Sequence, residues 1–342
     1  MHIEAQRIAI IKLGAIGDVV NSLPFVNRLR AGYPRARITW VIAPIAHALV
    51  SGHRAADEFL VIDVKQPGKW PAIVRDLRAR EFDLAIDLQR ILKSGLITRA
   101  TGAGARLGFD RARCKEQSWL FTNHKIAPNR APGVTVEQYL EFADWLECPQ
   151  IPARFDLPFE PCAAPLRGET RIVVNVGASK PANRWPTDKW ARLCRRLVRE
   201  LGATIHFTGG AQDAAEIEAV MHAIETGAVG LSDTDAVRLV NQAGRLSLKA
   251  SAGLIASAHL FIGCDMGPLH IAVAVGTRVV ALFGASDPRR TGPFAQSLGI
   301  VNEPAPCSPC RRRDCHVAGQ PCMSRLSEDR VFERARARLA ER

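Results

Sequence analysis

The sequence contains no apolar run that approaches the roughly 18 residues of a membrane-spanning helix, although 47% of its 342 residues are hydrophobic. Its first residues lack the charged and apolar regions of a signal peptide and lead directly into a strand-like segment. Aromatic residues make up only 6%, and no zinc-finger or RNA-recognition signature is found. These absences predict a cytoplasmic protein and give no support to nucleic-acid binding.

Nine cysteines fit that compartment as free thiols or ligands better than as a disulfide framework. Four of them have metal-like spacing, Cys307-x2-Cys310-x4-Cys315-x6-Cys322, with His316 beside the third. Four thiolates can hold zinc or iron as a structural clip, but the spacing matches no common zinc module. Metal binding and ordinary thiols both remain open, and we assign no metal ligand and no cofactor.

The whole chain has a formal net charge of +12. Positive charge is concentrated in one part of it. Residues 90–130 carry nine basic residues against two acidic ones, Asp110 and Glu116. The local excess indicates an anionic partner for the N-terminal half, or else a solvated basic surface. Nucleic acid is the alternative partner of a different class, and the low aromatic content argues against it.

Strand-like and helix-like segments alternate along the chain, which predicts an α/β protein with parallel sheets. We expect strands at 7–13, 38–42, 56–64, 84–87, 171–176, 204–208, 260–263 and 279–283. We expect helices from Asp18 onward and at 70–80, 92–101, 134–147, 187–201, 212–224, 248–258, 269–275 and 327–342. Residues 148–170 contain five prolines and little periodicity, so they predict a linker between domains at 1–155 and 170–342.

The stretch at 259–294 organises the second domain. A buried strand leads into Asp265-Met266-Gly267-Pro268 and a short helix that Gly276 ends. Asp265 is expected to cap this helix, and a helix opening off a strand offers N–H groups and a positive dipole end to a diphosphate. One more βαβ unit, with Asp265 only a cap, explains the same pattern.

Four motifs occur in an order that resembles glycosyltransferase family 9, the ADP-heptose:lipopolysaccharide heptosyltransferases. They are Lys12-Leu-Gly-Ala-Ile-Gly-Asp18 with Leu23-Pro24, Asp87-Leu-Gln89 with Lys93-Ser94, Arg184-Trp185-Pro186, and Asp265-x-Gly-x-x-His270 with Leu282-Phe283-Gly284-x-x-Asp287-Pro288. The resemblance covers about residues 7–294, and residues 83–147 look closer to heptosyltransferase I than to heptosyltransferase II. It implies the GT-B fold, two Rossmann-like domains with a cleft between them.

The resemblance also implies which domain binds which substrate. The acceptor belongs to the N-terminal domain and the nucleotide-sugar to the C-terminal one, whose tail includes the cysteines at 307–322. For the donor it implies Ser179, Lys180, Asn183, Arg184, Asp213, Glu216 and the segment Asp265, Met266, Gly267, Pro268, Leu269 and His270. For an anionic acceptor, the candidates are Gly17, Gln89, Lys93, Arg113 and Lys115.

Asp18 is the candidate general base, because the attacking hydroxyl must lose a proton as the glycosidic bond forms. Helix capping is its structural alternative, and a core histidine is the alternative for His270. Two positions depart from the family pattern. Asn183 stands where a lysine is usual, and Met266 stands where a threonine or serine is usual.

These features predict an inverting, metal-independent transfer of L-glycero-D-manno-heptose from ADP-heptose to the Kdo/heptose inner core of lipopolysaccharide. The acceptor would be Kdo-lipid A or its heptosylated product, reached by peripheral contact with the anionic cytoplasmic face of the inner membrane. A related transferase with another nucleotide-sugar or acceptor is the alternative within the same fold. The sequence leaves the acceptor sugar and the oligomeric state open.

Overall fold

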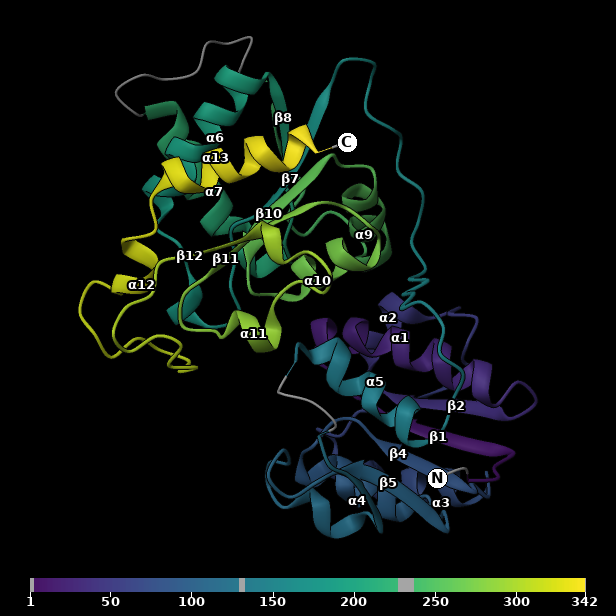
Figure 1. The fold of residues 1–342 in the computed structure, drawn as a ribbon. Coiled ribbons are helices and arrows are strands. Elements are labelled where there is room, and N and C mark those ends of the chain that lie inside the picture. The colour runs from purple at the N-terminus through teal and green to yellow at the C-terminus, as the bar shows by residue number, and fades with distance from the viewer. Residues whose placement is uncertain (1–2, 129–132, 227–236, 342) are drawn as a thin grey trace. The chain divides into compact units, whose positions relative to one another are not determined.

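The computed structural model describes residues 3–128, 133–226 and 237–341. Two compact units divide the chain between Pro158 and Phe159, as Figure 1 shows. Each unit contains one six-stranded parallel sheet with helices on both faces. The prediction of two doubly wound α/β domains is therefore confirmed.

In unit 1, strands and helices alternate from the N-terminus. The strands are β1 (Arg7–Ile11), β2 (Arg37–Ile42), β3 (Glu58–Val61), β4 (Leu84–Asp87), β5 (Ala105–Phe109) and β6 (His124–Ile126), and they lie in the order β3-β2-β1-β4-β5-β6. The helices are α1 (Ile16–Gly32), α2 (Pro44–Val50), α3 (Trp70–Arg78), α4 (Leu92–Ala100) and α5 (Thr135–Trp145), with 3-10 turns η1 (Pro67–Lys69) and η2 (Ser118–Phe121).

Successive strand residues point to opposite sides of this sheet. Both faces are buried because helices cover each of them. On one side Ile11 of β1 packs with Leu77 of α3 and Ile97 of α4. On the other side α1 packs on α5, where the rings of Phe25 and Phe142 meet edge to face with centroids 6.0 Å apart. The central strand β1 is thus fixed, and the residues that follow it are held at the carboxyl edge of the sheet.

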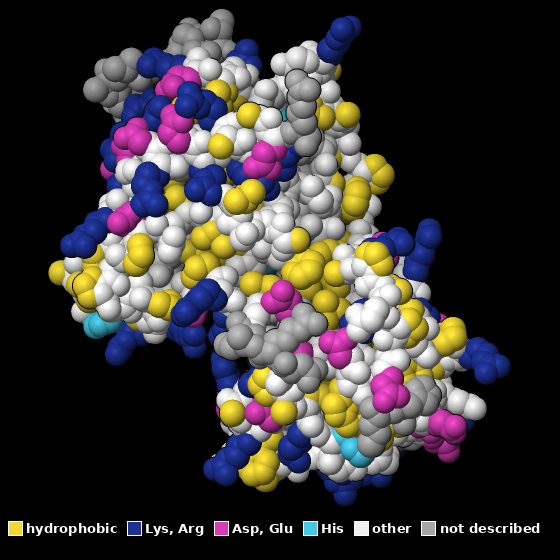
Figure 2. All heavy atoms as spheres, in the orientation of Figure 1, with side chains coloured by type: hydrophobic (Ala, Val, Ile, Leu, Met, Phe, Trp, Pro, Cys, Tyr) yellow, Lys and Arg dark blue, Asp and Glu magenta, His cyan; other side chains and the backbone are white. Residues whose placement is uncertain are grey.

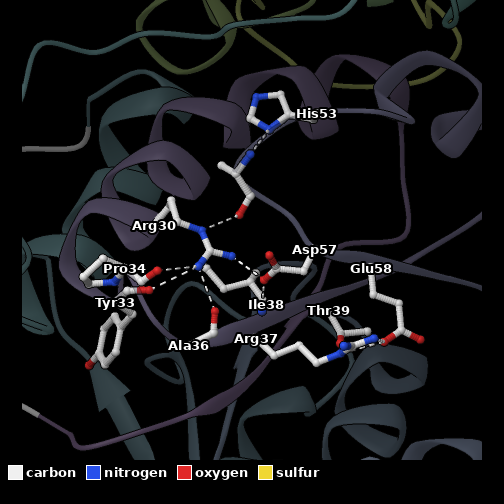
Figure 3. A network of polar contacts seen from close by, with 11 residues as sticks. Arg30, Tyr33, Pro34, Ala36, Arg37, Ile38, Thr39, His53, Asp57 and Glu58 are labelled. Atoms are coloured by element: carbon white, nitrogen blue, oxygen red, sulfur yellow. Dashed lines mark hydrogen bonds and ion pairs between the residues drawn. The ribbon is translucent and has the colours of Figure 1, made fainter.

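Several arginines of unit 1 serve the fold. Arg30 of α1 donates to the carbonyl oxygens of Ala36 and Ala55 and forms an ion pair with Asp57 (Figure 3). Asp57 also accepts the amide hydrogen of Ile38 at 2.7 Å. This network ties the end of α1 to the start of β2, at the opposite end of the strand from its carboxyl edge.

In unit 2, the strands are β7 (Thr170–Asn175), β8 (Ala203–Phe207), β9 (Leu239–Asn241), β10 (Leu260–Cys264), β11 (Val279–Phe283) and β12 (Ile300–Asn302), in the order β12-β11-β10-β7-β8-β9. The helices are α6 (Thr187–Leu201), α7 (Ala214–Thr226), α9 (Leu248–Ala256), α10 (Gly267–Ala274), α11 (Pro288–Thr291), α12 (Pro321–Ser324) and α13 (Glu328–Ala340). The 3-10 turns are η3 (Pro181–Asn183), η4 (Ala211–Asp213) and η5 (Ser297–Gly299).

Helices α6, α7 and α13 cover one face of this sheet, and α9 and α10 cover the other (Figure 1). Ile262 on β10 lies between Val174 on β7 and Val280 on β11, in register. All three side chains are fully buried. Near-continuous apolar runs are expected for strands buried on both faces, which is why these strands are readable from the sequence.

The sequence interpretation missed β5, β6, β9, β12 and α2, and it made β3 too long. Three of the missed strands, β6, β9 and β12, have only three residues each and lie at the edges of their sheets, and β5 lies next to β6. Their pairing depends on a neighbouring strand rather than on their own apolar pattern. The sequence therefore indicated the sheet centres but not their full width.

The two ends of the proline-rich segment 148–170 belong to different units, and each end makes hydrogen bonds within its own unit. Arg28 of α1 donates to the carbonyl oxygens of Cys148 and Pro149. Farther along, the Glu160 amide donates to the carbonyl oxygen of Lys249 at 3.2 Å. Among the described residues, no helix has both the length and the apolar content needed to cross a membrane.

Candidate active site

Asp18 lies just beyond the carboxyl end of β1, in the first turn of α1. The N-cap of α1 is Ala15, so the capping alternative for Asp18 does not hold. Its Oδ2 instead accepts a hydrogen bond from Lys12 Nζ at 3.3 Å. The Asp18 side chain is 44% exposed and that of Lys12 only 1% exposed, so the carboxylate stays accessible to a ligand.

The ammonium of Lys12 is held in its charged form. Burial lowers its pKa, but the charge of Asp18 and the neighbouring Tyr139 outweigh burial, and the net pKa is raised. Lys12 Nζ also lies 5.4 Å from the centre of the Tyr139 ring. A buried cation therefore pairs with an accessible carboxylate.

Gln89 and Asp87 support the loop that precedes Asp18. Gln89 Oε1 accepts the amide hydrogens of Leu13 and Gly14 at 3.1 and 3.3 Å. Asp87, which is buried, accepts from the Gln89 amide at 2.9 Å and from Ser94 Oγ at 3.0 Å. Burial raises its pKa to about 6 despite these donors. The motif at 87–94 thus links β4 to the turn after β1.

The predicted acceptor cations have different surroundings. Lys93 and Lys115 are exposed. Arg113 is held by ion pairs with Asp110 and Glu141 and donates to the Ile126 carbonyl oxygen. Its side chain is 15% exposed. Gly17 is buried within the first turn of α1.

In unit 2, Asp265 follows β10, but it is not the cap of α10 as predicted. The N-cap is Met266, with no side-chain capping bond. The Asp265 carboxylate accepts from Thr291 Oγ1 at 3.0 Å and lies 3.7 Å from His270 Nε2. Burial would raise its pKa, but hydrogen bonds, chiefly with His270, lower it overall. Asp265 is thus an anion that orients His270.

The start of α10 offers fewer amide donors than the sequence suggested. Pro268 has no N–H, and the Leu269 amide donates to the carbonyl oxygen of Met266 at 3.1 Å. This leaves the amides of Met266 and Gly267 as donors for an anion at this end of the helix. His270 lies one turn farther on and is buried.

Asn183 anchors the loop after β7 to the loop after β11. Its Nδ2 donates to Ser286 Oγ at 2.7 Å, and its Oδ1 accepts from the Ser286 amide at 3.2 Å. The amide side chain is therefore used in a structural link. Ser179 and Arg184 in the same loop are exposed, and Lys180 is half-buried.

Trp185 is a packing residue. It is buried and meets Trp190 edge to face at 4.8 Å between ring centroids, while its Nε1 donates to the Leu326 carbonyl oxygen at 3.1 Å.

Asp213 and Glu216 stand at the start of α7, with different roles. Asp213 is buried, and its Oδ2 accepts the Gly210 amide hydrogen at 2.8 Å. Its carboxylate fills the space where Cβ atoms at Gly177 and Gly209 would lie. Glu216 lies 3.8 Å from the guanidinium of Arg184, and burial raises its pKa. Asp213 thus shapes the loops, whereas Glu216 faces a ligand space.

That space is a cavity of about 640 Å3. Its lining comes from the start of α6, from α7 and from the tail: Arg184, Trp185, Pro186, Thr187, Glu216, Cys315, Val317, Gly319, Gln320, Met323 and Ser324. The segment 265–270 does not line it. Of the predicted donor residues, only Arg184 and Glu216 line this cavity.

The cysteine tail packs against the donor loops. Cys322 and Met323 are buried, and a Cβ at Gly284 would meet their sulfur atoms. All nine cysteines are free thiols. In the part of the chain that the structure describes, which includes the whole tail, no group of three or more His, Cys, Asp or Glu is arranged to hold a metal ion.

Asp287, at the start of α11, ties the tail to the sheet edge. It accepts hydrogen bonds from Arg289 at 3.1 Å and from Arg311 of the tail at 2.8 Å. These bonds, the one from Arg289 first, lower its pKa to about 2, although burial opposes them. Because the folded-state pKa is depressed, the stabilisation is present above about pH 4 and is lost as the pH falls toward 2.

We expect Asp287→Asn to lower the free energy of unfolding at pH 7, because the variant loses the charged hydrogen bonds from Arg289 and Arg311. The loss should be only about 1–2 kcal/mol, because both arginines are exposed and solvent screens their charge. Asparagine keeps the capping oxygen, so the variant removes the charge alone. Urea unfolding of both proteins from pH 7 to pH 2 measures the difference, which should close in acid. A difference that stays constant with pH would contradict the assignment.

The sequence did not single out Thr291 or Ser286 as partners of Asp265 and Asn183. The contacts join residues 26 and 103 positions apart, so no local pattern signals them. Lys12 was visible only as part of the first motif, and its burial beside Asp18 was not.

Solved structures of other proteins share this fold. The solved structure of Escherichia coli ADP-heptose lps heptosyltransferase II matches with a TM-score of 0.74, covering 97% of this chain and 98% of that one at 22% identity. A glycosyltransferase family 9 member from Veillonella parvula gives 0.77 at 20% identity, covering 100% and 99%. The fold is that of a GT-B glycosyltransferase.

The model of glycosyltransferase family 9 (heptosyltransferase) matches residues 70–320, and the chain belongs to this family. Among curated relatives, lipopolysaccharide heptosyltransferase 1 of Pseudomonas aeruginosa is 25% identical over 361 residues, covering 98% of each chain. Lipopolysaccharide core heptosyltransferase OpsX of Haemophilus influenzae is 23% identical over 310 residues, covering 87% of this chain and 84% of that protein. The resemblance found in the motifs is confirmed.

Proposed function

We propose that this glycosyltransferase moves L-glycero-D-manno-heptose from ADP-heptose to the Kdo/heptose inner core of lipopolysaccharide, with inversion and without a metal ion. The observation that carries the proposal is the pair of Asp18 and Lys12, an accessible carboxylate beside a buried ammonium at the carboxyl edge of a parallel sheet. Family membership and the names of the curated relatives support the donor and the class of acceptor.

In the proposed reaction, Asp18 accepts the proton of an acceptor hydroxyl. The hydroxyl oxygen forms a bond to C1 of the heptose while the bond from C1 to the β-phosphate oxygen breaks. ADP leaves with that electron pair, and attack from the opposite side inverts the configuration at C1. Before the transfer, the ammonium of Lys12 balances the charge of the ionised Asp18 carboxylate.

The leaving diphosphate needs stabilisation of its developing charge. We assign this to His270 and to the amides of Met266 and Gly267, because all three lie in the first turns of α10 or at its cap, where the helix dipole is positive. With Asn183 committed to Ser286, the cations nearest in sequence are Lys180 and Arg184. Ser179 and Glu216 complete the proposed donor contacts, and Asp213 shapes the loops behind them.

On the acceptor side, Lys93 and Lys115 are the proposed contacts to carboxylate and phosphate groups, since both are exposed. Arg113 is neutralised by two carboxylates, so we propose that it positions the loop that carries Lys115. Gln89 and Gly17 shape the approach to Asp18 rather than carrying charge.

Removing the two exposed lysines tests the acceptor assignment. We expect Lys93→Gln/Lys115→Gln to raise KM for Kdo2-lipid A about tenfold and to leave KM for ADP-heptose unchanged. Steady-state kinetics with each substrate varied in turn measures both constants. Arg35→Gln/Arg75→Gln removes the same charge from exposed positions of unit 1 and should change neither. An equal rise of both constants would instead indicate a role in folding.

An activity screen of ADP-heptose against Kdo2-lipid A and its heptosylated product tests the function directly. Turnover with another nucleotide-sugar would favour a related transferase. Separate calorimetric titrations with ADP and with an RNA oligonucleotide distinguish a glycosyltransferase from a nucleic-acid-binding protein. Salt-sensitive RNA binding without ADP binding would overturn the proposal. We propose a location at the cytoplasmic face of the inner membrane, where a lipid-linked acceptor would be met.

A further inference from the structure

Three large hydrophobic side chains of unit 1 are exposed on two neighbouring elements. Leu92 and Leu96 on α4 are each 41% exposed, and Leu120 on η2 is 57% exposed. The two elements are in direct contact, because a Cβ at Gly95 would lie 2.6 Å from the Phe121 ring. We call these leucines and the residues around them the α4–η2 surface. It holds three of the ten large hydrophobics that are exposed in the described chain.

Basic side chains surround the leucines. Lys93 and Arg99 are exposed on α4, and Arg111 and Lys115 are exposed on the loop that joins β5 to η2. Arg111 lies over the ring of the half-buried Trp119, 5.2 Å from its centre. Figure 2 shows hydrophobic and basic side chains next to each other over the α4 end of unit 1. Exposed leucines with a rim of lysine and arginine and a tryptophan are features of proteins that lie on anionic bilayers.

We propose that the α4–η2 surface docks on an anionic lipid bilayer. The leucines enter the boundary between headgroups and acyl chains, and the basic rim contacts lipid phosphates. The inference rests on the proposed function, in which the acceptor is a lipid-linked sugar, and it names the surface that meets the membrane. Helix α4 starts three residues after Gln89, whose side chain holds the turn before Asp18. Docking would thus bring the acceptor side of unit 1 to the lipid.

Charge and shape favour a bilayer over other occupants. Single-stranded nucleic acid is bound through aromatic platforms on which bases stack, whereas the exposed apolar groups here are aliphatic. A symmetric contact with a second copy would place one basic rim against another. Anionic lipids satisfy both the apolar and the basic parts of the surface.

Sedimentation of the full chain with vesicles of phosphatidylethanolamine and phosphatidylglycerol tests the inference. We expect binding that weakens with salt, that is much weaker on phosphatidylcholine vesicles, and that falls about 10–100-fold in Leu96→Ser/Leu120→Ser. The matched control is Leu166→Ser/Leu298→Ser, because these leucines are 79% and 67% exposed in unit 2 and should not contribute. Leu96→Met/Leu120→Met keeps the apolar surface and should bind as the wild type does, whereas unchanged ADP binding by the serine variant excludes misfolding as the cause of its loss.

Equal binding by the serine variant and the wild type, or equal loss in the control pair, would overturn the inference. The inference would also be overturned if RNA displaced the protein from the vesicles at a salt concentration where vesicle binding is strong. ADP binding and turnover with a lipid-free Kdo disaccharide report on the proposed function separately. Both should be unchanged in the serine variant; lost turnover there would assign the leucines to the reaction site instead.

Discussion

Replacing Asp18 with asparagine is expected to lower kcat by about 10²–10⁴-fold, the usual cost of losing a general base, with the Kd for ADP unchanged. Asparagine has nearly the same size as aspartate, and Asp18 is not the cap of α1. The helix should therefore form normally, while the group that takes the hydroxyl proton is absent. Single-turnover kinetics and calorimetry with ADP measure the two quantities.

Loss of the Asp18 charge leaves the buried ammonium of Lys12 without its counter-ion, so stability must be followed by thermal melting. Asp18→Glu keeps the negative charge but moves the carboxylate by one methylene, and it should retain the fold while still losing rate. Asp188→Asn is the matched control, because Asp188 lies in the first turn of α6 and is exposed. If Asp18→Asn is folded and fully active, no carboxylate is needed at this position and the base assignment is wrong.

Replacing His270 with alanine is expected to lower kcat/KM for ADP-heptose by about 10²–10³-fold, the range seen when a donor to a developing anion is removed. Asp265 lies 3.7 Å from His270 Nε2 and fixes the ring at the dipole-positive end of α10. His270→Gln retains an N–H donor and should restore part of the rate. Steady-state kinetics with ADP-heptose as the varied substrate gives the comparison.

The matched control for His270 is His259, which lies just before the start of β10, whereas His270 lies in the helix that follows the end of β10. His259 precedes β10, and its Nδ1 is 3.1 Å from the Arg171 amide nitrogen. His259→Gln should leave kcat/KM unchanged. Were His270→Ala to lower the melting temperature and leave the kinetics of the folded fraction intact, His270 would be a core residue, as the structural alternative holds.

The sequence predicted where candidate site residues lie along the chain better than it predicted what their side chains contact. Asp18, Gln89, Asp265 and His270 could be proposed from the sequence because each comes after an apolar strand, and the parallel strands of each sheet place such residues at its carboxyl edge. Their hydrogen-bond partners were not found. The capping role expected for Asp265 was wrong, because its side chain reaches Thr291, a residue of a later element, rather than the amides next to it.

The acceptor side shows the same limit. Arg113 and Lys115 look alike in the sequence, as basic residues in a basic stretch. Glu141 of α5, 28 residues farther along the chain, pairs with Arg113, whereas Lys115 stays exposed. Which of two cations is available to an anionic ligand therefore depends on which helix packs beside it.

The sequence by itself determined the central strands of both sheets, most of the longer helices, the parallel arrangement and the family, because apolar periodicity and motif spacing are local properties of the chain. Tertiary structure alone decided which charges are paired. It buried Lys12 beside Asp18, tied Asn183 to Ser286 and placed Leu120 beside α4. The physical reason is that hydrogen bonds and ion pairs act over a few ångströms, and only folding brings residues distant in the chain to that range.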